Sequence, residues 1–311
     1  MGLLGAATGA PDRIDDLAVA STKVLTARGG PRLRSSPRLS GRPEEPGGTV
    51  STPSADGCVL TAVDGPVLTI TLNRPHVRNA IDAALSRAAA AAFRDFDDDP
   101  GLSIAVLTGA GGHFCAGMDL KAFSRGEAVG AEGGGLLGLT RQPTRKPVIA
   151  AVEGYALAGG FEVALACDMV VAAEGARFGI PEVSRGLMAG SGGLVALATH
   201  LPRAVAAEIA FTGRQLSAQE AARWGLVNAV VADGGAVARA RELAAEIAAN
   251  SPSAVAASKS VLLAALPMPG DALWSHQDAL LEQVLASADA REGALAFVEK
   301  RAPVWAPLTA P

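Results

Sequence analysis

The sequence predicts an α/β protein in which ββα units come first and a helical region comes last. Runs of β-branched residues alternate with helical patterns through the first part of the chain, and glycine-rich loops follow buried strands. Beyond Gly190 the strand patterns give way to consecutive helical segments, so helices are expected to cover a β-rich core. With 49% of 311 residues hydrophobic, the chain can form a sizeable core. A net charge of −4 argues against a strongly basic nucleic-acid surface.

Three regions are predicted. Residues 1–55 are rich in Gly, Pro, Ser and Arg and are expected to form a disordered tail, because they offer little apolar surface to bury. The arginines resemble those of a transit peptide, but acidic residues among them argue against one, and no signal-peptide pattern is present. Residues 56–250 are expected to form the ββα core, and residues 251–311 a helical C-terminal region.

The core is expected to begin with a β-hairpin. The runs "CVLTAV" and "PVLTITLNRP" are separated by Asp64-Gly65, a pair typical of hairpin turns. The alanine-rich "IDAALSRAAAAAFRDF" then predicts a helix that begins after Asn79 and ends near Pro100. Next come a buried strand, "SIAVLTG", and a glycine-rich loop, "GAGGHFCAGMD".

The following segments alternate strand and helix. "KPVIAAVEG" predicts a buried strand, "GGFEVALAC" a helix, "DMVVAA" a strand, and "ARFGIPE" a short strand that ends at a proline. Residues 147–173 are apolar enough to resemble a membrane span. Three acidic residues inside them, each costing ~3 kcal/mol at bilayer depth, favour a buried core instead. The expected helices beyond Gly190 are 192–200, 203–211, 217–224, 235–249, 252–266, 271–287 and 290–300.

Cysteine and histidine usage limits the classes of site. The three cysteines, Cys58, Cys115 and Cys167, are sparse and lack CxxC spacing, which favours a reducing, cytoplasmic compartment. The four histidines occur at no metal-binding spacing, so no metal site is expected.

The stretch "YALAGGFEVALACD" places one acid, Glu162, inside an apolar run. An ionised carboxylate there is costly unless it is paired or hydrogen-bonded. Glu162 falls in the first turn of a predicted helix, where unpaired amides and adjacent glycines would let a ligand approach the backbone. The segment fits an acid–base group beside an oxyanion site, but it fits a merely favourable helix start equally well.

Two further segments favour a catalytic site. In "HFCAGMDL", the backbone at Gly117 and Met118 offers a second N–H group, and two such donors from separate loops make an oxyanion hole. In "FGIPEVSRG", Glu182 follows a strand and a proline and is expected to lie in a loop. Two carboxylates from neighbouring elements could act on one substrate as acid and base.

Together these segments, with "GALAFVEKRAPVW" near the C-terminus, resemble the crotonase family of enoyl-CoA hydratases and isomerases over roughly residues 57–305. The resemblance implies a spiral of ββα units and a thioester carbonyl held by the amides of Met118 and Gly159. Family hydratases keep both glutamates, whereas simple isomerases usually keep only the second. Glu162 and Glu182 therefore imply reversible hydration of a 2-enoyl-CoA, as in fatty-acid β-oxidation.

The resemblance also implies how coenzyme A is bound. Arg78 and Lys121 match cations that contact the nucleotide, and Phe297 and Lys300 match a C-terminal pair that reaches CoA, often from the next subunit. It implies a homotrimer or a hexamer. It requires no cofactor, because CoA is part of the substrate, and no nucleic-acid or membrane partner. The glycine-rich segment 123–142 is expected to line the acyl pocket.

Several alternatives stay open. "AGSGG" around Ser191 is similar to a nucleophile elbow but lacks its first glycine, and "TGAGGH" is not a dinucleotide fingerprint. Carnitinyl-CoA dehydratases share the "MDLKAFSRGEA" and C-terminal patterns, and isomerase, thioester hydrolase or non-catalytic CoA- or RNA-binding members use the same scaffold. Structural roles are expected for Asp168 at a strand start and for Cys115 as a buried filler, and His113 has no evident partner.

Overall fold

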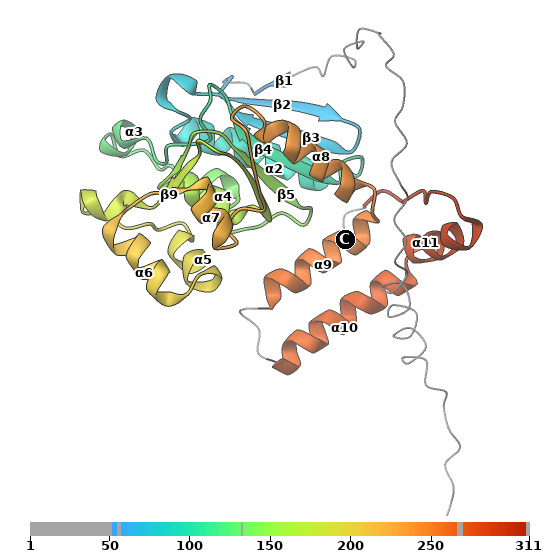
Figure 1. Ribbon diagram of the computed structural model, residues 1–311. Coiled ribbons are helices and arrows are strands. Elements are labelled where there is room, and N and C mark those ends of the chain that lie inside the picture. Colours follow the sequence, from blue (N-terminus) through green and yellow to red (C-terminus); the bar gives the residue numbers. More distant parts are fainter. Residues whose placement is uncertain (1–51, 55–56, 132, 266–269, 309–311) are drawn as a thin grey trace, which may run out of the picture. The chain divides into compact units, whose positions relative to one another are not determined.

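The computed structural model describes residues 52–54, 57–131, 133–265 and 270–308 (Figure 1). The prediction of a disordered tail over residues 1–55 lies outside these residues, except that Thr52 and Pro53 pair antiparallel with the first hairpin strand. The strands are β1 (Thr52–Pro53), β2 (Val59–Asp64), β3 (Val67–Leu72), β4 (Ile104–Gly109), β5 (Val148–Val152), β6 (Tyr155–Leu157), β7 (Met169–Ala173), β8 (Arg177–Gly179), β9 (Leu216–Ser217) and β10 (Ala229–Val231).

A seven-stranded sheet organises the described residues, in the order β1-β2-β3-β4-β5-β7-β10. The predicted hairpin at Asp64-Gly65 is confirmed, since β2 and β3 pair antiparallel with Asp64 opposite Val67. The pairs from β3 to β10 are all parallel. A second sheet has the order β6-β8-β9, with β6 and β8 parallel. The α/β fold class expected from the sequence is confirmed.

The helices are α2 (Ala83–Asp98), α3 (Leu120–Ser124), α4 (Gly159–Ala166), α5 (Gly193–His200), α6 (Arg203–Thr212), α7 (Ala218–Arg223), α8 (Ala236–Ala248), α9 (Pro252–Ala264), α10 (Gly270–Ala286) and α11 (Ala288–Glu299). Three short 3₁₀ helices accompany them: η1 (Pro75–Val77), η2 (Leu136–Gly138) and η3 (Pro181–Arg185). Glu182 therefore lies in the 3₁₀ helix η3 rather than in the loop that the sequence predicts, because Pro181 supplies the fixed φ of a first helical residue.

Both faces of the large sheet are buried, as expected for parallel strands. In β4, Ile104 and Val106 face a cluster that includes Ala240 and Ala244 of α8, whereas Ala105 and Leu107 face the main core. Figure 1 shows α8 on one side of the sheet and α2 and α4 on the other. The apolar stretch 147–173 folds as β5, β6, α4 and β7, and no helix in the described part of the chain is both long and apolar enough to cross a bilayer.

The C-terminal region is helical, as the sequence predicts. Helices α9 and α10 run side by side, and α11 packs on α10 (Figure 1). Asp168 joins α9 to the sheet: its Oδ2 accepts the Val148 amide of β5 at 2.8 Å and pairs with Lys259 Nζ of α9 at 2.8 Å. A structural role for Asp168 is thus confirmed. Asp168 directly precedes β7, and its side chain accepts a hydrogen bond from the first residue of β5.

Candidate active site

A cavity of about 560 Å³ holds both glutamates. It lies among α3, α4, η2, η3 and the loop before α5, with Glu162 and Glu182 in its walls. Met118 and Gly159 line the same space. The four residues expected to be catalytic or to bind an oxyanion are thereby brought together from three separate parts of the chain.

Glu162 is held by backbone amides. Its side chain is buried, and Oε1 accepts the Ser191 amide at 2.7 Å and the Gly193 amide at 3.0 Å. Both donors belong to the glycine-rich turn that begins α5, where amides have no partner within the helix. Charge-assisted bonds of this kind stabilise the ionised carboxylate and fix its orientation. Glu162 is therefore suited to act as a base.

Glu182 has the opposite surroundings. Its Oε2 atom is buried and has no hydrogen-bond partner in the described residues. Burial raises the pKa of Glu182; its own amide lowers the pKa by less, and the negative charge of Glu162 raises it by the smallest amount. A carboxyl group with a raised pKa, directed into the cavity, is suited to donate a proton there.

The amides of Met118 and Gly159 are placed to receive an oxyanion. Neither amide donates to an acceptor in the described part of the chain. The two loops touch, because a Cβ at Gly117 would lie 2.7 Å from the Ala158 Cβ and 3.2 Å from the Gly159 nitrogen. Gly117 has a φ of +98°, and Ala158, which precedes α4, has a φ of +51°, a conformation that costs energy for a residue with a Cβ.

Buried polar contacts fix the loop that contains Met118. Asn79 is fully buried and donates to the carbonyls of Ala110 and His113 at 3.0 and 2.7 Å. The Cys115 amide donates to the Tyr155 carbonyl at 2.8 Å, which ties the loop to β6. The Cys115 thiol contacts the Asn79 carbonyl, and burial raises its pKa to about 12, so Cys115 stays a neutral filler as expected.

The predicted CoA-binding cations lie beside the cavity and do not line it. Arg78 is exposed, its carbonyl accepts the amide of Ala116 in the cavity wall, and its guanidinium lies 5.4 Å from the centre of the Tyr155 ring. Lys121 is exposed on α3, next to Leu120 of the wall. Both positions leave the cations accessible to a substrate that enters the cavity.

The predicted C-terminal pair lies elsewhere. Phe297 is 86% exposed near the end of α11, and Lys300 is the exposed residue that caps this helix. Neither residue lines the cavity that holds the glutamates. Within one chain, the structure does not bring this pair to the site.

Two features of the site were missed in the sequence. The "AGSGG" segment does not serve as a nucleophile elbow but supplies the amides that hold Glu162, and the glycine pair before a helix was the available signal. The expectation that His113 lacks a partner is wrong, since its ring stacks on Tyr155 with centroids 4.8 Å apart and its Nδ1 accepts the Tyr155 amide. Burial and the charge of Arg78 lower the pKa of His113.

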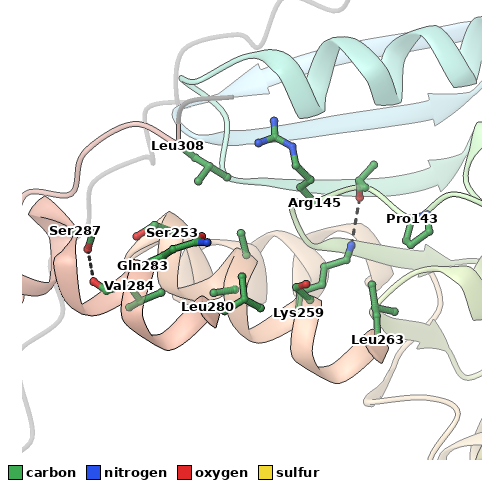
Figure 2. A pocket seen from close by; sticks show the side chains of 14 residues that line it. Pro143, Arg145, Ser253, Lys259, Leu263, Leu280, Gln283, Val284, Ser287 and Leu308 are labelled. Carbon is green, nitrogen blue, oxygen red and sulfur yellow. Dashed lines mark hydrogen bonds between the residues drawn. The ribbon is translucent and has the colours of Figure 1, made fainter. Parts of the chain in front are cut away.

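The segment 123–142 contributes Phe123, Val129 and Leu136 to the cavity, which agrees with its expected place at the site. A second cavity, of about 510 Å³, lies between α9, α10 and residues 143–145 (Figure 2). Its walls are largely apolar, and its buried cation, Lys259, is already paired with Asp168. The first cavity, which brings the predicted site residues together, is therefore the candidate active site.

Comparison with known proteins identifies the family of the chain. Residues 63–307 match the enoyl-CoA hydratase/isomerase family, and the chain belongs to that family. It is accordingly an enzyme of the crotonase family, with the fold that the sequence resemblance implies. A carnitinyl-CoA dehydratase of Salmonella typhi is 48% identical over 250 residues, which cover 78% of this chain and 95% of that protein.

Solved structures give the same fold. The enoyl-CoA hydratase of Mycobacterium marinum is 52% identical, with a TM-score of 0.78 over 80% of this chain and 98% of that chain. A carnitinyl-CoA hydratase from Mycobacterium avium is 44% identical, with a TM-score of 0.65 over 80% of this chain and 98% of that one. The two relatives are named for different CoA thioester substrates.

Proposed function

We propose that this protein catalyses the reversible addition of water to a 2-enoyl-CoA, giving a 3-hydroxyacyl-CoA. The observation that supports it is one cavity lined by Glu162, Glu182, Met118 and Gly159. The cavity offers a base, an acid and two backbone donors, which are the groups that this reaction needs. The presence of both glutamates favours hydration over simple isomerisation of the double bond.

In the proposed mechanism, the thioester oxygen lies between the amides of Met118 and Gly159. Glu162 accepts a proton from water while the water oxygen forms a bond to C3. The electron pair of the C2–C3 double bond moves toward the thioester oxygen, where the two amides stabilise the negative charge. Glu182 then donates its proton to C2 as the thioester carbonyl is restored. Proton transfer through water returns the two carboxyl groups to their starting states.

The CoA moiety is proposed to contact Arg78 and Lys121 through its phosphates, because both cations are exposed beside the cavity. Phe297 and Lys300 are proposed to complete the CoA site from a second copy of the chain, since they lie away from the cavity of their own chain. This arrangement requires at least two copies, which we propose assemble as a homotrimer or a hexamer. No metal or redox cofactor takes part in the proposed steps, and CoA enters as part of the substrate.

The direct test is turnover of crotonyl-CoA, followed by loss of the enoyl thioester absorbance. Glu162→Gln and Glu182→Gln should each lower kcat by ~10²-fold or more, the range that a general acid or base supplies. Binding of a saturated acyl-CoA, measured by calorimetry, should persist in both variants. Wild-type turnover in both variants, or no turnover by the wild type despite binding, would overturn the proposal.

A second candidate is dehydration of carnitinyl-CoA, favoured by the Salmonella relatives at 48% identity. The same two glutamates would run the reaction in the elimination direction on an acyl group that bears a trimethylammonium. The two candidates differ only in the substituent that the cavity must accept. Relative kcat/KM values for carnitinyl-CoA and 3-hydroxybutyryl-CoA separate them.

A further inference from the structure

Arg185 is a cation that the catalytic steps leave unused. It ends η3, three residues after Glu182, and it lines the same cavity. A 3₁₀ helix has three residues per turn, so side chains three apart stand on one face. Glu182 and Arg185 therefore both face the cavity from η3.

The guanidinium of Arg185 makes no hydrogen bond or ion pair with any residue that the structure describes. By contrast, Arg74 bridges Asp82 and Asp119, and Arg214 bridges Glu208 and Glu220. An arginine with no such partner is available to a ligand, and its planar fork suits a carboxylate or a phosphate.

Large apolar side chains line the outer part of the cavity that Arg185 shares. Leu120, Phe123, Leu187 and Met188 line the cavity and are partly exposed, so they form its open rim. Gly159, Glu162 and Leu136 are buried and form its floor, where the reacting carbons would lie. Arg185 is exposed and belongs to the rim. Its charge would act on the part of the substrate that extends away from the glutamates.

Among the residues that the structure describes, the rim has no cage of aromatic rings for a quaternary ammonium. Such cations are bound by cages of several aromatic rings, and Phe123 is the one aromatic side chain among the described residues of this cavity. The two acidic side chains of the cavity are Glu162, whose Oε1 accepts two amides, and Glu182, which the proposed reaction uses as the proton donor. A trimethylammonium would meet Arg185 without a compensating aromatic cage.

We propose that Arg185 sets the acyl specificity of this enzyme, favouring an acyl group that ends in a carboxylate over one that ends in a trimethylammonium. This inference rests on the proposed hydratase function and adds the substrate class. A carboxylate on the carbon beyond C3 would extend toward the rim, where the guanidinium can bind it through two parallel hydrogen bonds. A trimethylammonium at the same place would be repelled by the same charge.

Three matched substrates test the proposal in the dehydration direction. 3-Hydroxybutyryl-CoA is neutral beyond C3, 3-hydroxyglutaryl-CoA ends in a carboxylate, and carnitinyl-CoA ends in a trimethylammonium. Each kcat/KM value is divided by the value for the neutral substrate, 3-hydroxybutyryl-CoA. In Arg185→Leu, this relative kcat/KM should fall about tenfold for 3-hydroxyglutaryl-CoA and should rise several-fold for carnitinyl-CoA. A tenfold change in relative kcat/KM is the size expected when one charge–charge contact at a solvent-exposed site is removed.

Two variants provide the comparison. Arg185→Lys keeps the charge and should retain most of the preference for the carboxylate substrate. Arg94→Leu removes an exposed arginine on α2, outside the cavity, and should leave all ratios at their wild-type values. The CoA phosphates are the other anions that Arg185 could bind. An equal loss with all three substrates in Arg185→Leu would assign the guanidinium to CoA and overturn the specificity proposal.

A binding measurement separates this inference from the proposed reaction. Glutaryl-CoA and butyryl-CoA lack the double bond and the hydroxyl group, so their affinities can be compared without turnover. The wild type should bind glutaryl-CoA more tightly than butyryl-CoA. The Kd of butyryl-CoA divided by the Kd of glutaryl-CoA should fall about tenfold in Arg185→Leu. An unchanged ratio would overturn the role of Arg185 even if hydration is confirmed. If the wild type does not turn over crotonyl-CoA but the Kd ratio falls as expected in Arg185→Leu, only the hydratase function would be overturned.

Discussion

Glu162 and Glu182 are chemically identical side chains that the protein places in different surroundings. One oxygen of Glu162 accepts two amides, whereas Glu182 has a buried oxygen that no described group satisfies. Hydrogen bonds to a carboxylate favour its charged form, and burial without them favours the neutral form. These different surroundings fit the roles that the proposed reaction gives the two residues, a base at Glu162 and a proton donor at Glu182.

This asymmetry predicts a pH dependence. Burial and the charge of Glu162 raise the pKa of Glu182, so raising the pH through that value removes the proton that hydration requires. We expect kcat/KM to fall with increasing pH above a raised carboxyl pKa. The fall should be parallel for hydration and dehydration, because the overall equilibrium involves no proton. Rate profiles with crotonyl-CoA and 3-hydroxybutyryl-CoA measure it.

The residual activity of Glu182→Gln should not show this fall of kcat/KM with increasing pH, because the glutamine side chain has no titrating proton. A fall that persists unchanged in the variant would show that another group controls it. A wild-type profile that rises with pH through the same region would contradict the assignment of Glu182 as the proton donor.

At the scale of single elements, the start of α5 positions Glu162. The amides of Ser191 and Gly193 contact the carboxylate, and the helix start packs closely against the side chain. A Cβ at Gly193 would lie 2.7 Å from Glu162 Cγ, closer than real Cβ atoms approach a neighbour. Only a glycine at this position lets the helix begin where its amides reach the glutamate.

Gly193→Ala should therefore displace Glu162 and lower kcat by about tenfold or more, with a smaller effect on KM, because the substrate-binding walls remain. Steady-state kinetics with crotonyl-CoA measure the separate effects on kcat and on KM. Gly270→Ala is a matched control, since a Cβ at Gly270 meets no atom within 4 Å. An unchanged kcat in Gly193→Ala would show that the turn does not hold Glu162.

The ion pair between Lys259 and Asp168 joins α9 to the large sheet. The Lys259 side chain is 8% exposed and that of Asp168 is 22% exposed, and the lysine also donates to the Lys146 carbonyl at 2.9 Å. Removing one partner of a buried pair leaves the other charge without compensation. Because Asp168 retains some contact with water and the Val148 amide, the cost should be below that of a fully buried pair.

Lys259→Met should lower the free energy of unfolding by about 2 kcal/mol, as judged from urea denaturation. Arg239→Ala breaks an exposed pair with Glu242 on α8 and should leave the urea midpoint within experimental error of the wild type. Equal midpoints for Lys259→Met and the wild type would mean that the pair does not stabilise the packing of α9.

At the scale of the whole molecule, the C-terminal helices expose large apolar side chains. Trp274 and Leu285 of α10 are each 61% exposed, and Phe297 and Val298 of α11 are 86% and 76% exposed. Apolar surface of this kind on neighbouring helices is typical of an interface. It supports the proposed assembly, in which α11 of one copy approaches the cavity of another.

The full chain should therefore behave as a trimer or a hexamer in light scattering, and its specific activity should fall on dilution as the copies separate. Phe297→Asp should weaken assembly and raise KM for CoA thioesters. Circular dichroism would verify that the variant is folded. A monomer with full activity at all concentrations would contradict both the assembly and the shared CoA site.

The extent of agreement between sequence and structure follows from the range of the interactions involved. Each helix expected beyond Gly190 is present within a few residues, because periodicity and capping act over neighbouring positions. The short strands β6, β9 and β10 were not predicted, since strands of two or three residues depend on distant partners. Helix α3, which has five residues, was not predicted either.

The sequence by itself determined the α/β class and the family, and it predicted the four residues expected at the reaction centre, because local patterns and motif order carry that information. Only the tertiary structure decided that Glu162 is held by the amides of Ser191 and Gly193, that Glu182 has an unsatisfied oxygen, and that Arg185 shares their cavity. These features depend on burial and on contacts between loops distant in sequence. The solvation of a charge is set by the packed surroundings and not by its neighbours along the chain.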